Sequence, residues 1–305
     1  MKRSRQSTVF SPPSSAGQVR AKSSGRAGHR SLRLASPDDA RGLYSLIVVS
    51  PHFDDAALSL GGTILREARR GGRALVVDVC TARPPTSGLS AFALYQHEQW
   101  GAAQPWLARE AEEEEAMTLL GADHLWLGLP DAIYRGELYA SEEALFGQIS
   151  PSDPALEPLV AALRRIAESQ PAATVFAPLG VGGHVDHRLA LRAALDLTAH
   201  GTPVRLYEDA PYCLRPGATD AALAALGVTL VPDHSPIDED ELLGKIAAVL
   251  TYASQARWVF REYGEVRCRH GQQLCPRPAA QDADDTLAGC SPAAIGRGAF
   301  DDTGD

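Results

Sequence analysis

The chain has 305 residues, of which 45% are hydrophobic and 22% are charged, as is ordinary for a soluble globular protein with a sizeable core. The formal net charge of −9 is unevenly distributed, because residues 1–42 contain nine Lys or Arg and two Asp. The rest of the chain is therefore strongly acidic. Since binding to phosphate backbones requires a concentrated basic surface, nucleic acid is not expected as a partner.

The composition divides the chain into three parts. Residues 1–42 are rich in Ser, Arg, Gly and Pro, so we expect a disordered basic N-terminal tail, with a transit peptide as the less favoured alternative. Residues 43–264 carry the apolar runs and are expected to form the folded domain. Residues 265–305 are rich in Pro, Gly and Asp and are expected to be irregular or disordered.

The sequence has no apolar run of about 18 residues, so membrane insertion is not expected. No CxxC pair occurs among the five cysteines, and we expect reduced thiols in a cytoplasmic protein. The cysteines are Cys80, Cys213, Cys268, Cys275 and Cys290. Nothing in the sequence indicates an oligomeric state.

Short apolar runs alternate with helical patterns along the chain. The expected strands are Leu46–Ser50, Ala74–Cys80, His124–Leu129, Thr174–Leu179, Val204–Tyr207 and Val228–Val231. The expected helices between them are Asp55–Arg70, Arg109–Leu120, Leu156–Glu168 and His187–His200. This alternation predicts an α/β fold: a Rossmann-like layered fold with a mostly parallel sheet and helices on both faces.

Two long connections, residues 79–109 and 130–154, show little helical pattern and are expected to be loops. Both would leave the carboxyl ends of strands, which is where ligands bind in open α/β sheets.

The first polar cluster lies where the first predicted strand gives way to a helix. There "LIVVSPHFDD" places His52, Asp54 and Asp55. A helix N-cap accounts for one Asp but leaves the second Asp and the His unexplained. Imidazole and carboxylate are ordinary zinc ligands, and a catalytic zinc takes three protein ligands. One carboxylate can bind the metal while the other acts as a general base.

Gly61 and Gly62 lie inside the helix that follows, where each Gly costs about 1 kcal/mol relative to Ala. Close packing of this helix on the sheet is the expected reason. No GxGxxG opens the helix, so a dinucleotide-binding dehydrogenase is disfavoured. Lys245, on a later helical pattern, is expected to be a surface charge.

The second polar cluster follows a later strand, in "APLGVGGHVDHRLALRAA". A Gly-rich turn leads into a helix that begins with His184, Asp186 and His187, and an incidental helix start is the alternative interpretation. The carboxyl ends of parallel strands share one edge of the sheet, so the two clusters can converge. One His could then bind the metal while the other donates to a developing oxyanion, and Asp186 could orient either imidazole.

With its "PHFDD" and "HVDH" motifs, the sequence resembles the PIG-L or LmbE-like family of zinc-dependent N-deacetylases. The resemblance covers about residues 44–262. It implies that His52, Asp55 and His187 bind Zn²⁺ and that Asp54 is the general base. It also implies that His184 stabilises the tetrahedral intermediate or protonates the leaving amine.

Arg109 and Asp131 fall near positions that resemble substrate contacts in this family. The resemblance implies hydrolysis of an N-acetyl or N-acyl group on an N-acetylglucosamine-type conjugate, so the expected partner is a small amino-sugar conjugate. Two alternatives stay open. One is an amidase acting on a larger thiol or secondary-metabolite conjugate, and the other is a non-catalytic homologue that binds metal and sugar.

Overall fold

The computed structural model describes residues 31–40, 42, 44–100, 105–228, 230–233, 235–255 and 292–294. These residues contain one sheet of eight strands in the order β1-β4-β3-β2-β5-β6-β8-β7. The strands are β1 (Arg33–Leu34), β2 (Leu46–Ser50), β3 (Ala74–Asp78), β4 (Asp123–Trp126), β5 (Thr174–Pro178), β6 (Val204–Tyr207), β7 (Val231–Pro232) and β8 (Pro292–Ala294). Strands β1 to β6 pair in parallel, and β8 is antiparallel to β6 and β7. The predicted α/β class with a mostly parallel sheet is confirmed.

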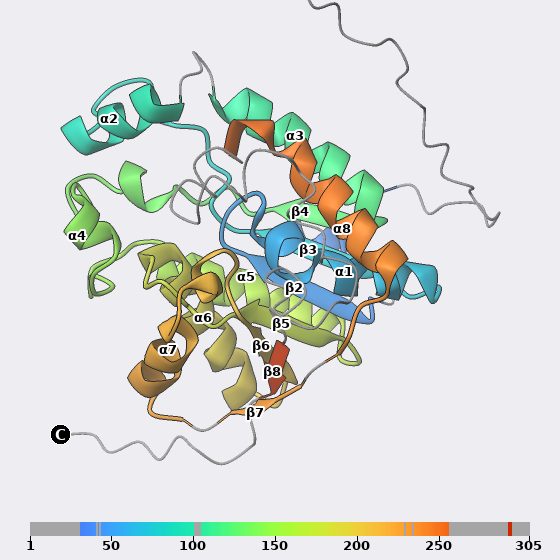
Figure 1. Ribbon diagram of the computed structural model, residues 1–305. Coiled ribbons are helices and arrows are strands. Elements are labelled where there is room, and N and C mark those ends of the chain that lie inside the picture. Colours follow the sequence, from blue (N-terminus) through green and yellow to red (C-terminus); the bar gives the residue numbers. More distant parts are fainter. Residues whose placement is uncertain are drawn as a thin grey trace, which may run out of the picture.

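The described helices cover both faces of the sheet, with α1, α3 and α8 on one face and α5 and α6 on the other (Figure 1). The helices are α1 (Asp55–Arg69), α2 (Ala91–Trp100), α3 (Pro105–Leu120), α4 (Glu142–Leu145), α5 (Leu156–Ser169), α6 (Val185–Ala199), α7 (Ala218–Leu226) and α8 (Glu239–Thr251). Short 3₁₀ turns form at Pro37–Asp39, Ala132–Tyr134 and Tyr212–Leu214.

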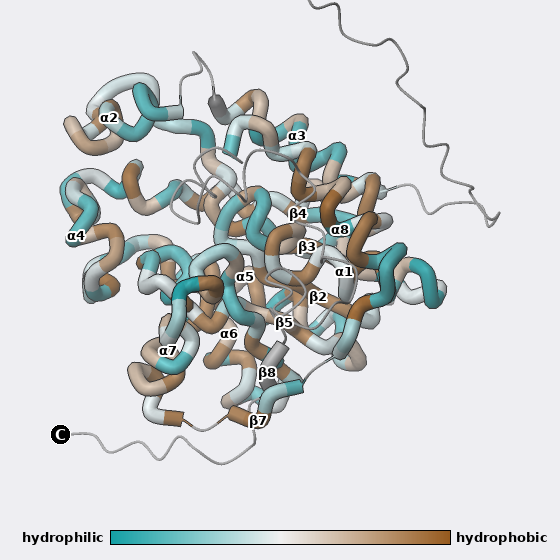
Figure 2. The backbone as a smooth tube through the Cα atoms, viewed as in Figure 1, coloured by the Kyte–Doolittle hydropathy of each residue, from teal (hydrophilic) through white to brown (hydrophobic). Residues whose placement is uncertain are grey.

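The central strands β2, β3 and β5 are hydrophobic over most of their length because both of their faces are buried. In β2, Val48 packs into the core under α1, α3 and α8, while Ile47 and Val49 pack into the core under α5 and α6. This alternation follows from the two-residue period of a strand. Figure 2 shows the resulting hydrophobic centre of the molecule in brown.

Strand β2 lies between β3 and β5, so the chain order reverses at β2. Its parallel register pairs Leu46 with both Ala74 of β3 and Thr174 of β5. The turns that follow β2 and β5 therefore leave neighbouring strands at the same edge of the sheet. This is the crevice in which open α/β sheets bind ligands.

Several elements differ from the prediction. The connection 79–109 contains α2 and the first turn of α3, and the connection 130–154 contains α4. Of the predicted strand Val228–Val231, Val231 begins β7, Val228 and Leu230 are not in a strand, and residue 229 lies outside the described residues. Strands β1 and β8 extend the sheet beyond the predicted 43–264 boundaries, into a segment expected to be disordered and one expected to be irregular or disordered.

The glycine pair in α1 has a different role from the expected one. A Cβ on Gly61 would lie 3.0 Å from Cγ of Lys245 on α8, and a Cβ on Gly62 would lie 3.0 Å from the Ile237 side chain. The glycines thus permit close packing of α8 on α1 rather than of α1 on the sheet. Lys245 is 2% exposed, so its assignment as a surface charge is wrong.

No helix in the described ranges is long and apolar enough to cross a membrane. Cys80 is a free cysteine, whereas Cys213 is disulfide-bonded. The expectation of reduced thiols is therefore wrong for Cys213.

Candidate active site

The first polar cluster is shaped by the sharp turn between β2 and α1. Ser50 Oγ donates to the His52 carbonyl and accepts from Ala56 N, which ties the end of the strand to the first turn of the helix. Asp54 precedes the helix with φ of 90°, a backbone conformation that is rare outside Gly. The turn places Asp54 and Asp55 in different directions, although they are adjacent in sequence.

The second cluster follows the turn between β5 and α6. Gly180, Gly182 and Gly183 all have positive φ, and a Cβ on Gly182 would lie 2.6 Å from the Tyr212 ring. Only Gly fits a turn that is both left-handed and this close to a neighbouring ring. The turn delivers His184 as the N-cap of α6, with His187 one turn further on.

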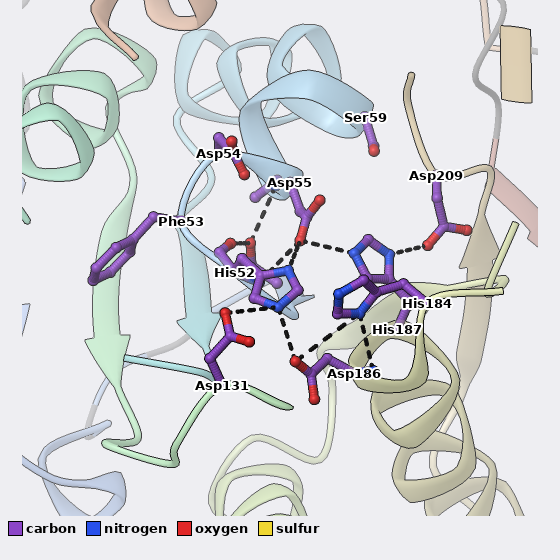
Figure 3. Close-up of polar contacts among 12 residues, drawn as sticks. His52, Phe53, Asp54, Asp55, Ser59, Asp131, His184, Asp186, His187 and Asp209 are labelled. Atoms are coloured by element: carbon purple, nitrogen blue, oxygen red, sulfur yellow. Dashed lines mark hydrogen bonds and ion pairs between the residues drawn. The ribbon is translucent and has the colours of Figure 1, made fainter. Parts of the chain in front are cut away.

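Three potential metal-binding atoms from the two clusters lie close together (Figure 3). Asp55 Oδ2 lies 3.3 Å from His52 Nδ1 and 3.4 Å from His187 Nε2, and all three donors lie within 4.8 Å of one another. Donors about 2.1 Å from a tetrahedral zinc are about 3.4 Å apart. These three residues therefore fit a divalent metal ion with little rearrangement.

The second nitrogen of each imidazole is held by a carboxylate. His187 Nδ1 donates to Asp209 Oδ1 at 2.6 Å, and His52 Nε2 donates to Asp186 Oδ2 at 3.0 Å. Both contacts leave the lone pair of the other nitrogen directed at Asp55. Carboxylates in this position fix the tautomer and orientation of metal-binding imidazoles.

Asp209 is 1% exposed and also accepts a hydrogen bond from Val181 N. Sequence reasoning did not identify it as the partner of an imidazole. Its position directly after β6, the neighbour of β5, was the available signal.

Asp186 is held by a buried network. Arg135 forms ion pairs with both Asp186 and Asp153, and all three side chains are at most 1% exposed. Ala132 N donates to Asp186 Oδ2, the oxygen that faces His52. Since buried charges require partners, Arg135 supplies a cationic partner for Asp186 beneath the candidate metal site.

The His184 imidazole has a defined tautomer. Its Nδ1 accepts from Asp186 N at 3.2 Å, so in the neutral ring the proton is on Nε2. Burial and the neighbouring His52 and His187 hold the pKa of His184 well below its ordinary value. His184 therefore offers a neutral N–H donor at the cavity.

The two adjacent carboxylates differ in their electrostatics. Burial and the neighbouring Asp55 raise the pKa of Asp54 to about 8. Burial also acts on Asp55, but the His187 and His52 imidazoles outweigh it and hold the pKa of Asp55 below its usual value. Asp55 is thus suited to stay ionised as a ligand, and Asp54 to exchange a proton near neutral pH.

The predicted site residues surround one cavity of about 910 Å³. Its lining includes His52, Asp54, Asp55, Arg109, Asp131, His184 and His187. Asp186 lies behind the lining, and Asp131 Oδ2 is 3.6 Å from His52 Nε2. The outer wall is formed by residues that were predicted to lie in loops, among them Tyr95 and Trp100 of α2 and Phe146 after α4.

Comparisons with known proteins identify one family. A model of the PIG-L family, described as GlcNAc-PI de-N-acetylase, matches residues 47–198. The 2'-N-acetylparomamine deacetylase of Streptomyces fradiae is 32% identical over 235 residues, which cover 76% of this chain and 79% of that protein.

Two solved structures share the fold. The zinc-inhibited form of teicoplanin deacetylase Orf2 has a TM-score of 0.60 and 28% identity, covering 70% of this chain and 86% of that chain. The A40926 pseudoaglycone deacetylase Dbv21 has a TM-score of 0.53 and 27% identity, covering 74% of this chain and 87% of that chain. Because both polar motifs meet in one cavity and a relative matches most of its length, this chain belongs to the PIG-L family of de-N-acetylases.

Proposed function

We propose that this protein is a zinc-dependent N-deacetylase that hydrolyses the N-acetyl or N-acyl amide of an N-acetylglucosamine-type conjugate. The observation that supports this most is the convergence of His52, Asp55 and His187 at the spacing of zinc ligands, next to the Asp54 carboxylate in one cavity. His52 Nδ1, Asp55 Oδ2 and His187 Nε2 would hold the metal.

When bound, zinc supplies Lewis acidity towards the amide carbonyl and the attacking water. Asp54 accepts a proton from that water at its carboxylate as the water oxygen bonds to the amide carbon, and its pKa of about 8 suits proton exchange near neutral pH. Nε2–H of His184 donates to the carbonyl oxygen as negative charge develops there. Asp54 then returns its proton to the leaving nitrogen, the C–N bond breaks, and the products are a carboxylic acid and a free amine.

Arg109 and Asp131 are proposed to contact the substrate, because both line the cavity beside the metal ligands. A volume of about 910 Å³ is near the upper end of the range of about 300–1,000 Å³ for pockets that bind drug-sized molecules. The cavity thus has room for a conjugate larger than a single sugar. Relatives named as deacetylases of 2'-N-acetylparomamine and teicoplanin support an amino-sugar antibiotic or its precursor as the substrate class.

The test is metal analysis of the purified protein combined with amine release from a substrate panel. The panel contains N-acetylated amino-sugar antibiotics, simpler N-acetylglucosamine conjugates, and analogues with longer acyl chains. We expect about one zinc per chain, activity that is lost on chelation and restored by Zn²⁺, and release of acetate or a longer acid that identifies the acyl group. A protein that binds metal and sugar but releases no amine would instead be the non-catalytic homologue, and failure to bind zinc would overturn the proposal.

A further inference from the structure

The peptide bond that precedes Asp54 is held from both sides by one helix. Arg109 Nη2 donates to the Phe53 carbonyl at 3.4 Å, and Asp54 N donates to Glu113 Oε2 at 3.3 Å. The Phe53 carbonyl and the Asp54 N–H belong to the same peptide unit. Arg109 and Glu113 are one turn apart on α3, so both side chains leave the same face of that helix.

Glu113 is itself fixed by a third element. Tyr252, directly after α8, donates its hydroxyl to Glu113 Oε2 at 2.6 Å, so this oxygen accepts from Asp54 N and Tyr252 together. Glu113 is 0% exposed and Tyr252 is 2% exposed. Helices α3 and α8 lie side by side beside α1 (Figure 1), and Tyr252 at the end of α8 thereby reaches Glu113 on α3.

A carboxyl group at this position is costly for the fold. Burial raises the pKa of Glu113 to about 7, and its second oxygen, Oε1, has no hydrogen-bond partner among the described residues. An apolar side chain of similar size would avoid both costs. A requirement of core packing alone therefore does not explain a glutamate here.

Asp54 has a backbone conformation that needs such support. Its φ of 90° is the only positive φ at a non-Gly residue in the described part of the chain. A side chain in this region is strained, and it persists only where the surroundings hold it. The two contacts fix the orientation of the peptide group between Phe53 and Asp54, and this orientation determines the φ of Asp54.

We propose that Arg109 and Glu113 are positioning residues for Asp54, with Tyr252 fixing Glu113, and that together they aim the Asp54 carboxylate at the reacting amide. The proposal rests on the proposed function, because it concerns the orientation of the general base. Arg109 acts here through the backbone, in addition to its place in the cavity lining. Glu113 and Tyr252 do not line the cavity and act only through Asp54.

The test compares Glu113→Leu, Glu113→Gln and Tyr252→Phe with a control, Glu115→Leu, on the exposed side of the same helix. Leu removes both hydrogen bonds to the carboxyl group, whereas Gln keeps an acceptor oxygen and resembles the protonated acid. We expect Glu113→Leu to lower kcat by about 10- to 100-fold, with less than about a threefold change in KM. Glu113→Gln should recover most of kcat, and Tyr252→Phe should give an intermediate loss.

Three further readouts separate positioning from a structural role. The melting temperature of Glu113→Leu should equal or exceed that of the wild type, because a buried carboxyl group is removed, and its zinc content should be unchanged. Hydrogen exchange at the Asp54 amide should become at least about tenfold faster in Glu113→Leu, while exchange in β2 is unchanged. Glu115→Leu should change none of these quantities.

The amide-exchange measurement needs no substrate. It therefore tests the positioning of Asp54 by Glu113 even if the panel yields no turnover and the proposed function fails. Exchange at Asp54 that is the same in Glu113→Leu as in the wild type would overturn the proposal. So would a wild-type kcat in Glu113→Leu when the wild type is active. If Glu113→Leu fails to fold, the same two measurements on Tyr252→Phe decide, since that change keeps the ring and removes only the hydroxyl.

Discussion

Asp209 Oδ1 accepts a hydrogen bond from His187 Nδ1 at 2.6 Å, and both side chains are at most 2% exposed. Asp209 follows β6 and His187 lies in α6, so the contact joins two elements at the edge of the sheet where the candidate metal ligands lie. The carboxylate keeps the His187 lone pair on Nε2, directed at Asp55.

Replacing Asp209 with Asn removes the charge that fixes this tautomer. We expect the dissociation constant for zinc to rise by about 10- to 100-fold, because carboxylates behind metal-binding imidazoles contribute this much to affinity. Competition with a chromogenic chelator measures the change. The control is Asp196→Asn on α6, which breaks a partly exposed ion pair with Arg164 away from the cavity. Equal zinc affinity in the Asp209→Asn and Asp196→Asn proteins would contradict the prediction.

Asp54→Asn tests the general base, because Asn has nearly the same shape but cannot accept the proton. We expect kcat to fall by about 10²- to 10⁴-fold while zinc stays bound, since Asp54 is not among the three converging donors. Initial rates of amine release and metal analysis on the same sample give both quantities. His52→Ala is the comparison, because it removes a proposed metal ligand and should therefore lose the metal as well as the activity. A near-normal kcat in Asp54→Asn would show that another group is the general base.

The part of the site that lies directly after the ends of strands could be predicted from the sequence. The apolar run before His52 and the one before the Gly-rich turn each indicate a buried strand, and parallel pairing brings their ends to one edge. What the sequence does not display is which carboxylate faces which imidazole. Asp186 and Asp209 look alike as polar residues near strand ends, and only the packing of α6 and β6 distributes them between His52 and His187.

The elements that were missed have weak local patterns. Ala91–Trp100 mixes apolar and polar residues without one apolar face and buries only Ala93, so periodicity does not distinguish it from a loop. The burial of Lys245 depends on Gly61, which lies far away in the sequence and lets α8 approach α1. Tertiary contacts of this kind leave no periodic signal in the segment itself.

His124 predicts a pH dependence of stability that is independent of the metal site. It lies in β4 with 3% exposure, and burial, followed by the charge of Arg33, lowers its pKa to about 4. Between this value and the ordinary value of about 6.5, the unfolded chain binds a proton that the folded protein excludes. Its neutral state therefore stabilises the fold fully above about pH 6.5, and this contribution is lost as the pH falls towards 4.

On going from pH 7 to pH 4.5, we expect the wild type to lose about 2 kcal/mol more unfolding free energy than His124→Gln. Urea denaturation at the two pH values measures it for the wild type and the variant. His200→Gln is the control, because the His200 side chain is 54% exposed at the end of α6. The same pH dependence in the His124→Gln and wild-type proteins would show that His124 protonates freely in the fold.

Arg135 is the buried cation that pairs with the carboxylates of Asp153 and Asp186 beneath the site. Its two terminal nitrogens pair with Asp153 and Asp186, and Tyr139 also donates to Asp153 at 2.7 Å. Arg135→Met keeps the volume of the side chain but leaves two buried carboxylates without their cation. Breaking a buried pair in this way costs about 3–5 kcal/mol, far more than breaking one at the surface.

Urea denaturation of Arg135→Met should therefore show a loss of about 3–5 kcal/mol in unfolding free energy. The matched variant is Arg165→Met, which breaks the ion pair with Asp38, whose two side chains are 62% and 51% exposed. That variant should lose less than about 1 kcal/mol. Because Asp186 faces His52, Arg135→Met should also weaken zinc binding, and Arg135→Met/Asp186→Asn should recover part of the stability by removing one uncompensated charge. A double variant less stable than Arg135→Met would mean that the Asp186 carboxylate stabilises the fold without its cation, through Ala132 N and His52 alone.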